Sequence, residues 1–270
     1  MVHIAINMIA LLTDFGTADT FAGTMKAVIA TISPHMPIID LTHDIPPQDI
    51  LSGAWSLSVA YPYLPLDAII VAVVDPGVGT SRQPIAIRQG ERIVIAPDNG
   101  ILTYILEQYT TDKAVVLDNP YWWRQGKTSA TFHGRDIFAP VAAWLARGVS
   151  LSEVGTTIDT AKLVRLPLSK PAIIGNQITA NVIHIDHYGN IITNIHDELA
   201  GKLLTQEHIT GKIGRKAVTV IAATFADAPP DRPFWYLDSS GYLAIGWRNN
   251  DAAQRLRATK TSPITIKLGK

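Results

Sequence analysis

Short apolar runs alternate with segments of helical spacing through the first 168 residues, and this alternation limits the possible fold more than any other feature. Ile4 to Leu12 and Ala68 to Val74 are largely apolar runs of the kind that buried parallel strands have. Between them, apolar side chains recur at helical spacing over residues 21–32. Strand–helix alternation of this kind predicts an α/β domain with a mainly parallel sheet and helices packed on its faces.

The same patterns predict four further elements of this domain. They are strands at Pro37–Leu41 and Arg92–Ala96 and helices at Ile50–Val59 and Gly134–Arg147.

The pattern changes near residue 168. Pro167 to Gly175 contains two prolines and ends in a glycine, and helical spacing fades after it. Strand-like runs follow at Ile178–Ile185, Ala217–Phe225, Phe234–Leu237, Tyr242–Trp247 and Pro263–Leu268. We therefore expect an α/β N-terminal domain over residues 1–168, a linker over 169–176 and a smaller, mostly-β, barrel-like C-terminal domain over 177–270.

Composition excludes several classes of function. The chain has 23 Lys and Arg against 23 Asp and Glu, so no net charge attracts nucleic acid or an anionic membrane. It has no cysteine, which excludes disulfides, thiolate catalysis and thiolate metal sites. The N-terminal apolar run lacks a basic leader, and no apolar stretch reaches the ~20 residues that span a bilayer. We expect a cytoplasmic protein with a small-molecule ligand and no nucleic-acid or membrane partner.

The segment with the most direct chemical content is Val73 to Arg82, with the sequence VVDPGVGTSR. Asp75 ends an apolar run, and ligands of open α/β sheets bind where strands end. The glycines match neither a Rossmann fingerprint nor a Walker A loop. Arg82 follows the turn, and His133 precedes an expected helix, whose dipole disfavours a charged imidazole. Asp75, Arg82 and His133 are groups suited to activating water; the alternatives are a structural turn ion pair and a capping or core histidine.

Other polar residues also follow strand-like runs. Asp14 ends the first run, where one carboxylate can bind a ribose diol or cap a turn. In Asp186-His-Tyr-Gly-Asn190, the asparagine can pair with a purine edge and the aspartate with an ammonium group, or the segment is a hairpin turn. Ser239 and Ser240 lie in a turn.

The eight histidines show no spacing typical of a metal site. His184 and His187, three residues apart around Asp186, are only a weak metal signal. We expect no metal.

Seven segments, spread from Leu11 to Gly246, occur in the order known from one enzyme family. They are LLTDFG from Leu11, IDLTHDIPPQD from Ile39, VVDPGVGTSR from Val73, APDNGILT from Ala96, TFHGRDIFAP from Thr131, IDHYGNIITNI from Ile185 and SSGYLAIG from Ser239. Together they resemble the S-adenosyl-L-methionine hydrolases, or S-adenosyl-L-methionine hydroxide adenosyltransferases, which are relatives of the fluorinase and chlorinase enzymes.

The resemblance implies that water cleaves S-adenosylmethionine to adenosine and L-methionine, without a metal, nicotinamide or other cofactor. It also implies a homotrimer, with each site between the N-terminal domain of one subunit and the C-terminal domain of its neighbour. At the matching positions, Asp75, Arg82 and His133 would position and activate the water. Asp14 would hold the ribose hydroxyls, with Phe132 beside the ribose.

The resemblance also assigns residues of the C-terminal domain. Asn190 matches the asparagine on the adenine side, and Asp186 with Ser239 matches the residues that hold the amino acid group of methionine. Ser240 stands where some relatives have an arginine for the methionine carboxylate.

Three positions distinguish hydrolysis from halogenation. The fluorinase-like pattern has tyrosine at Asp75, tryptophan at Gln48 and a halide-binding serine at Gly134. A carboxylate at position 75 repels a halide and accepts a proton from water. Hydrolysis is therefore the expected reaction, and the alternatives are an S-adenosylmethionine-dependent halogenase and a non-catalytic protein that binds S-adenosylmethionine or adenosine.

Overall fold

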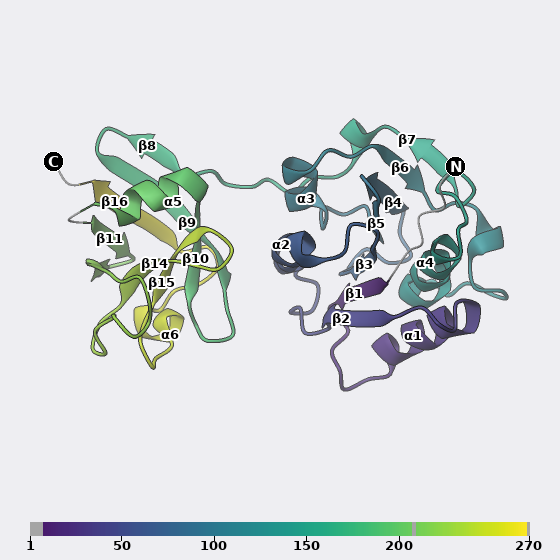
Figure 1. Cartoon of the computed structure of the whole chain (residues 1–270), viewed down its shortest axis with the longest axis horizontal. Helices are drawn as coiled ribbons and strands as arrows, with labels where there is room; N and C mark the ends of the chain where they lie inside the picture. Colours follow the sequence, from purple (N-terminus) through teal and green to yellow (C-terminus); the bar gives the residue numbers. More distant parts are fainter. Residues whose placement is uncertain (1–7, 207–208, 269–270) are drawn as a thin grey trace. The chain divides into compact units, whose positions relative to one another are not determined.

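The computed structural model describes residues 8–206 and 209–268. The chain divides into two units, Met1–Leu166 and Pro167–Lys270 (Figure 1). His3, His208 and residues 4–7 of the first expected strand lie outside the described residues.

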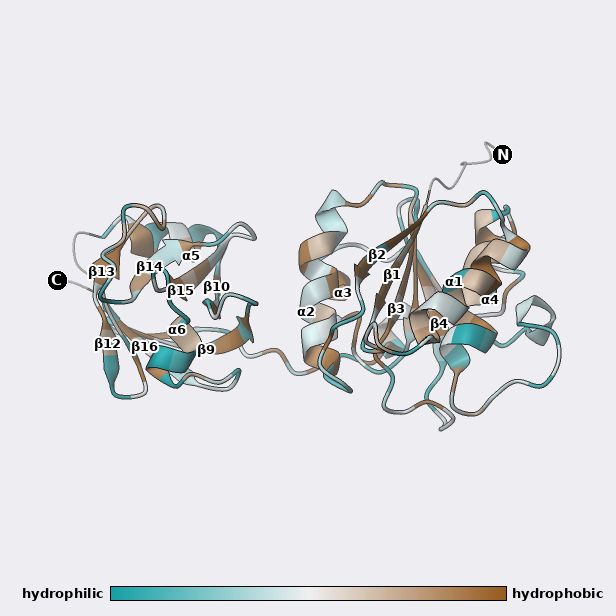
Figure 2. Ribbon diagram, turned by 90° about the horizontal axis from the view of Figure 1, so that it is seen from below, coloured by the Kyte–Doolittle hydropathy of each residue, from teal (hydrophilic) through white to brown (hydrophobic). Residues whose placement is uncertain are grey.

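The first unit is built on a sheet of apolar strands, which Figure 2 shows in brown. In the described part of the chain, seven strands take the order β2-β1-β3-β5-β4-β6-β7. Their bounds are β1 (Ile9–Thr13), β2 (Ile38–Thr42), β3 (Ile69–Val73), β4 (Pro84–Gln89), β5 (Arg92–Pro97), β6 (Lys113–Val116) and β7 (Thr156–Ile158). The helical segments are α1 (Phe21–Ile32), α2 (Ile50–Ala60), η1 (Tyr61–Tyr63), α3 (Thr103–Gln108), η2 (Pro120–Trp122), η3 (Gly134–Phe138), α4 (Ala139–Ala146) and η4 (Thr160–Lys162).

Strand direction divides this sheet into two parts. Strands β2, β1, β3 and β5 are parallel neighbours, as the sequence predicts, whereas β4, β6 and β7 run antiparallel. The reason lies in the β4–β5 connection, a tight turn in which Gly90 has φ +61°. A turn of this length joins only antiparallel strands, because parallel strands need a long crossover. The sheet is therefore mixed, and its parallel half carries the predicted site residues.

Helices cover both faces of the sheet, which confirms the predicted α/β class. One apolar cluster joins one sheet face to α1 and α4, through residues such as Met25, Ile29 and Val141. A second cluster joins the other face to α2 and α3, through residues such as Leu57 and Ile105. Figure 1 shows these two pairs of helices on opposite sides of the strands. Burial on both faces explains why the central strands are apolar without alternation.

Two acidic residues follow the carboxyl ends of adjacent strands in this sheet. Strands β1 and β3 are parallel, and Thr13 lies opposite Val73. Asp14 and Asp75 follow these residues by one and two positions, so both come at the carboxyl ends of adjacent strands. Ligands bind at this edge in open α/β sheets.

The expected helix over Gly134–Arg147 has a break in its geometry. Its first turn, η3, is π-helical, and α4 continues the segment as an α-helix. Pro140 has no N–H to donate back to Asp136, and the carbonyl of Asp136 instead accepts the backbone N–H of Arg124 at 2.9 Å. Short π-helical turns of this kind are frequent at functional sites.

The second unit is mostly β and barrel-like, as predicted. In its described residues the strand order is β12-β11-β16-β9-β10-β15-β14-β13, and β8 pairs with β9. Its elements are β8 (Ala172–Ile174), β9 (Gln177–Ile185), β10 (Ile191–His196), α5 (Asp197–Leu204), β11 (Ile209–Ile213), β12 (Lys216–Val218), β13 (Val220–Ile221), β14 (Phe234–Leu237), β15 (Tyr242–Gly246), α6 (Ala252–Leu256) and β16 (Pro263–Leu268).

One expected strand of this unit, Ala217–Phe225, is wrong in length. The segment is split because β12 pairs with β11 whereas β13 pairs with β14. The chain changes its pairing partner between Val218 and Val220, and Phe225 falls in the loop that follows.

In the described ranges, no helix combines the length and apolar character needed to cross a bilayer.

Candidate active site

Asp75, Arg82 and His133 are in direct contact. Arg82 donates through Nε to Asp75 Oδ1 at 2.9 Å and through Nη2 to Oδ2 at 2.5 Å. The same Nη2 lies 2.7 Å from His133 Nδ1. The side chains of Arg82 and Asp75 are only 8% and 5% exposed, so the pair is shielded from water. The structure thus brings together the three residues that the sequence singles out for activating water.

The contacts of His133 define its proton state. Because the guanidinium can only donate, Nδ1 acts as the acceptor and the neutral ring carries its proton on Nε2. Burial lowers the pKa of His133, and the positive charge of Arg82 lowers it further. From the sequence, a helix dipole is the expected cause of this low pKa; in the structure the causes are burial and the charge of Arg82.

Arg82 has one nitrogen, with two N–H groups, left over. This nitrogen, Nη1, is buried and has no hydrogen-bond partner among the described residues. A buried donor without a partner costs about 1–3 kcal/mol, so Nη1 is suited to an oxygen of a ligand.

The turn between Asp75 and Arg82 depends on Gly79. Its φ is +79°, and a Cβ added there would lie 2.3 Å from the carbonyl oxygen of Ala130. This close approach packs the turn against the segment that leads to His133. Glycine is needed here for conformation and for space.

We expect Gly79→Ala to lower the free energy of unfolding by about 1–3 kcal/mol more than Gly90→Ala does. Gly90 has φ +61° with no atom within 4 Å of an added Cβ, so its substitution costs backbone strain alone. Denaturant unfolding of both variants measures the difference. Equal losses would show that the contact with Ala130 is not tight.

Asp14 lies beside the loop that contains Gln48. Its Oδ2 accepts the backbone N–H of Gln48 at 2.8 Å, and Gln48 has φ +67°. Both residues belong to segments singled out in the sequence. The hydrogen bond holds the Asp14 side chain in place at the carboxyl end of β1.

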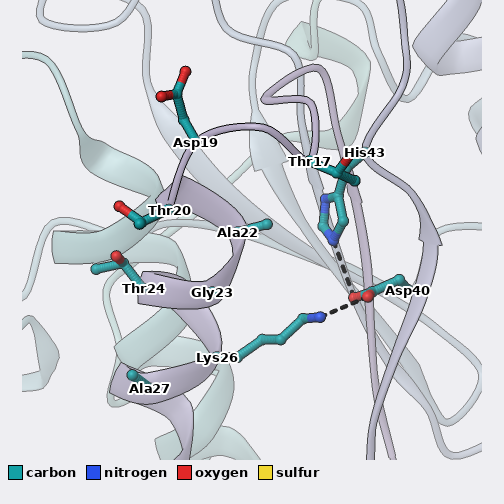
Figure 3. Close-up of a pocket in the computed structure, with 10 residues that line it drawn as sticks. All are labelled: Thr17, Asp19, Thr20, Ala22, Gly23, Thr24, Lys26, Ala27, Asp40 and His43. Carbon is teal, nitrogen blue, oxygen red and sulfur yellow. Dashed lines mark hydrogen bonds and ion pairs between the residues drawn. The ribbon is translucent and has the colours of Figure 1, made fainter.

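A buried histidine supports the segment that carries Asp14. His43 Nδ1 lies 2.8 Å from Thr13 Oγ1, and the backbone N–H of Gly16 donates to the His43 carbonyl at 2.7 Å. On its other side, Nε2 lies 3.0 Å from Asp40 Oδ1, and Lys26 Nζ lies 2.5 Å from Asp40 Oδ2 (Figure 3). Lys26, Asp40 and His43 border a cavity of about 510 Å³ against α1. Sequence reasoning missed this support, because its members come from three separate segments.

Phe132 belongs to a cluster of phenylalanines. Its ring meets Phe15 at 5.8 Å and Phe21 at 5.3 Å between ring centroids, both edge to face. Gly134 lies against the same cluster, where an added Cβ would lie 3.1 Å from Met25 Sδ and 3.3 Å from the rings of Phe132 and Phe15.

Asp136 anchors the segment around His133. It is fully buried and accepts hydrogen bonds from Arg124 Nε at 2.5 Å and Arg135 Nε at 2.7 Å. Burial alone would raise the pKa of Asp136, but the hydrogen bonds from Arg135 and Arg124 hold it well below its usual range. Asp136 is therefore a structural anion.

In the second unit, Asp186 and Asn190 form one hydrogen-bonded loop. Asp186 Oδ1 accepts the backbone N–H groups of Tyr188 at 2.9 Å and Asn190 at 2.8 Å, and Oδ2 accepts from Asn190 Nδ2 at 2.8 Å. The loop is therefore compatible with both interpretations of the sequence, a hairpin turn and a ligand site.

The loop borders a cavity of about 560 Å³ with aromatic walls. Asn190 lines it together with Tyr188, Phe225 and Trp247. Phe225 is 40% exposed, so part of its ring is open to a ligand in this cavity. Sequence reasoning missed Phe225 because it read the residue as the end of a strand.

Ser239 and Ser240 are exposed on the turn between β14 and β15. Asp238 organises this turn by accepting the N–H groups of Ser240 at 2.9 Å and Tyr242 at 2.8 Å. Burial raises the pKa of Asp238, and the negative charge of Asp186 raises it further. The carboxylates of this turn and of the Asp186 loop are thus close enough to interact electrostatically.

Within residues 8–206 and 209–268, no three His, Cys, Asp or Glu side chains are grouped so that they could hold a metal ion.

The fold and the site define a two-domain protein, in which an α/β unit carries a buried carboxylate and guanidinium beside a partly buried imidazole, and a barrel-like unit follows. Residues 9–155 match the SAM hydroxide adenosyltransferase N-terminal domain, and residues 180–265 match the C-terminal domain of the same family. The chain belongs to the S-adenosylmethionine hydroxide adenosyltransferase family.

Individual relatives agree with this membership. The chain is 40% identical over 269 residues to an (R)-S-adenosyl-L-methionine hydrolase of Salinispora arenicola (strain CNS-205), covering 97% of this chain and 98% of that protein. It is 29% identical to a fluorinase of Actinoplanes sp. (strain N902-109), over 88% of this chain and 90% of that one. Among solved structures, an uncharacterized conserved protein from Thermotoga maritima matches with a TM-score of 0.90 and 35% identity, covering 96% of this chain and 100% of that chain.

Proposed function

We propose that this protein hydrolyses S-adenosylmethionine to adenosine and L-methionine, by attack of water at C5′ of the ribose. The observation that carries the proposal is the direct contact of Arg82 with both Asp75 and His133, in which the Asp75–Arg82 pair is buried. The hydrolase relative named above, at 40% identity over nearly the whole chain, supports it.

The reaction needs one proton acceptor and no acid. A bond forms between the water oxygen and C5′ while the bond from C5′ to sulfur breaks, and its electron pair leaves with methionine as a neutral thioether. The water proton goes to a protein base and then to solvent. Positioning the water in line supplies a large share of the rate, roughly 7–11 kcal/mol in well-oriented systems.

The geometry favours Asp75 as the acceptor. His133 Nδ1 already faces Arg82, and its Nε2 carries the ring proton, so neither nitrogen is free to take another. Each oxygen of Asp75 accepts one hydrogen bond from Arg82 and keeps a second lone pair. Arg82 then has two tasks: it holds Asp75, and its Nη1 stabilises the developing hydroxide. His133 orients the guanidinium.

The substrate groups fit the remaining predicted residues. Asp14 holds the ribose hydroxyls beside Phe132. The adenine enters the cavity lined by Asn190 and Phe225, where the aromatic wall suits a flat base. Asp186, Ser239 and Ser240 take the amino acid group of methionine.

The proposal includes three features that rest on the resemblance and the composition. They are a homotrimer with sites at subunit interfaces, a location in the cytoplasm and a reaction without a cofactor. Light scattering of the purified chain tests the homotrimer, and a monomer that hydrolyses S-adenosylmethionine would contradict it.

The rival activities have different products. A halogenase given chloride or fluoride forms a 5′-halo-5′-deoxyadenosine, and a non-catalytic protein forms nothing. Gly134 disfavours the halogenase, because a serine side chain there would press on Met25 and two phenylalanine rings.

Incubation with S-adenosylmethionine, with and without added halide, separates these activities by chromatography. We expect adenosine and methionine in equal amounts, unchanged by halide. A halogenated nucleoside, or unchanged S-adenosylmethionine, would contradict the proposal.

A further inference from the structure

The carboxylate of Asp186 determines which way the side-chain amide of Asn190 faces. Asp186 Oδ2 accepts from Asn190 Nδ2 at 2.8 Å, while Oδ1 accepts two backbone N–H groups of the same loop. A carboxylate offers acceptors and no donor, so the NH2 end of the amide must face Asp186. The carbonyl end, Oδ1, is therefore directed away from Asp186.

The backbone of the loop holds this arrangement in place. The Asp186 N–H donates to the Asn190 carbonyl and the Gly189 N–H to the Asp186 carbonyl, both at 3.0 Å. Gly189 itself lies against Asp251, where an added Cβ would be 2.1 Å from Oδ1, and its carbonyl accepts the Ala253 N–H at 2.9 Å. With the backbone fixed on both sides, rotation of the amide by 180° would place Oδ1 against the Asp186 carboxylate.

The oriented amide belongs to the wall of the aromatic cavity. Asn190 is 6% exposed and lines the cavity with Phe225 and Trp247. None of the described residues donates a hydrogen bond to its Oδ1. The side chain can thus present one acceptor, in a fixed direction, to a flat ligand between these rings.

We infer that Asp186, by fixing the Asn190 amide, makes this cavity selective for purines with an amino group at C6 over purines with an oxygen there. The inference rests on the proposed function, in which the adenine of S-adenosylmethionine occupies the cavity. A 6-amino group donates to Oδ1, whereas a 6-oxo group faces Oδ1 with its own lone pairs. A polar site built for one partner rejects a ligand that leaves it unpaired. Asp186 is a positioning residue in this role.

Three nucleosides test this selectivity by titration calorimetry on the full chain. Adenosine carries the 6-amino group, purine riboside has only hydrogen at C6, and inosine has the 6-oxo group. All three lack the methionine part, so a contact of Asp186 with that part does not enter the comparison. We expect adenosine to bind at least about tenfold more tightly than purine riboside, and inosine to bind more weakly than both.

The variant Asp186→Asn gives the sharper test. Its side chain can donate or accept, so the Asn190 amide is free to turn and offer NH2 to a 6-oxo group. We expect the preference for adenosine over inosine to fall at least fivefold, and inosine to bind at least as well as purine riboside. The matched control is Asp238→Asn, which removes a carboxylate near Asp186 whose hydrogen bonds, among the described residues, are to its own turn. In this control the wild-type order of the three nucleosides is expected to persist.

Either of two results would overturn the inference. One is a wild-type protein that binds inosine as well as purine riboside; the other is a folded Asp186→Asn variant that keeps the wild-type order. Circular dichroism verifies folding, and Asp186→Ser, whose hydroxyl also donates and accepts, replaces the variant if it does not fold. Hydrolysis of S-adenosylmethionine by the wild type is assayed separately. An inactive protein with the expected order refutes the proposed function alone, and an active protein without this order refutes the inference alone.

Discussion

Asp75→Asn is expected to lower kcat for S-adenosylmethionine hydrolysis about 10²- to 10⁴-fold, which is the usual contribution of a general base. KM is expected to change much less, because the side chain faces the attacking water and not the bulk of the substrate. The amide keeps the size of the carboxylate but cannot take the water proton. Steady-state kinetics measure both constants, and Asp75→Ala is expected to give the same separation.

The same substitution has a cost in stability. Arg82 would keep its charge in a site where its side chain is only 8% exposed. Removing one partner of a buried ion pair typically costs about 3–5 kcal/mol. The matched control is Asp159→Asn, which changes an exposed helix-capping aspartate to another good capping residue. Full activity in Asp75→Asn, with Asp159→Asn also active, would contradict the role of Asp75.

Arg82→Met is expected to abolish most activity and to lower the free energy of unfolding by about 3–5 kcal/mol. The variant leaves the Asp75 carboxylate buried without its bidentate partner and releases His133 Nδ1. Denaturant unfolding measures the loss. Arg232→Met is the control, because Arg232 forms an exposed pair with Asp231 and is expected to contribute little. An equal loss of stability in both variants would show that the buried Asp75–Arg82 pair stabilises the fold no more than the exposed pair does.

The pH dependence of the free energy of unfolding provides a second test of the contact between Arg82 and His133. The pKa of His133 in the folded wild type lies below its ordinary value of 6.5, first because of burial and then because of Arg82. Below about pH 6.5 the unfolded chain therefore binds a proton that the folded chain does not, and stability falls as the pH falls. Without Arg82 this pKa rises toward 6.5, so the variant is expected to lose less stability between pH 7.5 and pH 5.5. An equal acid loss in both proteins would contradict the contact.

The sequence predicts much of the fold because its strongest patterns are local. Strand β3 and helices α1 and α2 come from an apolar run and from helical spacing, and the structure has them within one residue of the expected bounds. For the first strand, the described residues test only the later part of the expected run, where β1 ends at Thr13. Strand β4 was not predicted, because it begins at a proline, Pro84, and no helical segment separates it from β5. Direction in that half of the sheet depends on pairing, which local patterns do not contain.

In the candidate site too, the local sequence indicates individual residues but not the contacts between residues that are far apart in the chain. Residue types and strand ends pointed to Asp75, Arg82 and His133 as separate candidates, but only the fold shows that one guanidinium nitrogen contacts both of the others. The Asp186 loop had an open choice between a turn and a ligand site, and its hydrogen bonds explain why both descriptions fit. Phe225 could have been noticed as a large aromatic residue in a loop rich in small and polar residues, TFADAPPD.

Hydrolysis in 18O-water shows whether the water oxygen forms a bond to C5′ of the ribose. The chain is incubated with S-adenosylmethionine in labelled water, and both products are analysed by mass spectrometry. We expect one 18O atom in the 5′-hydroxyl of adenosine and none in methionine. Unlabelled adenosine, or label in methionine, would contradict this expectation.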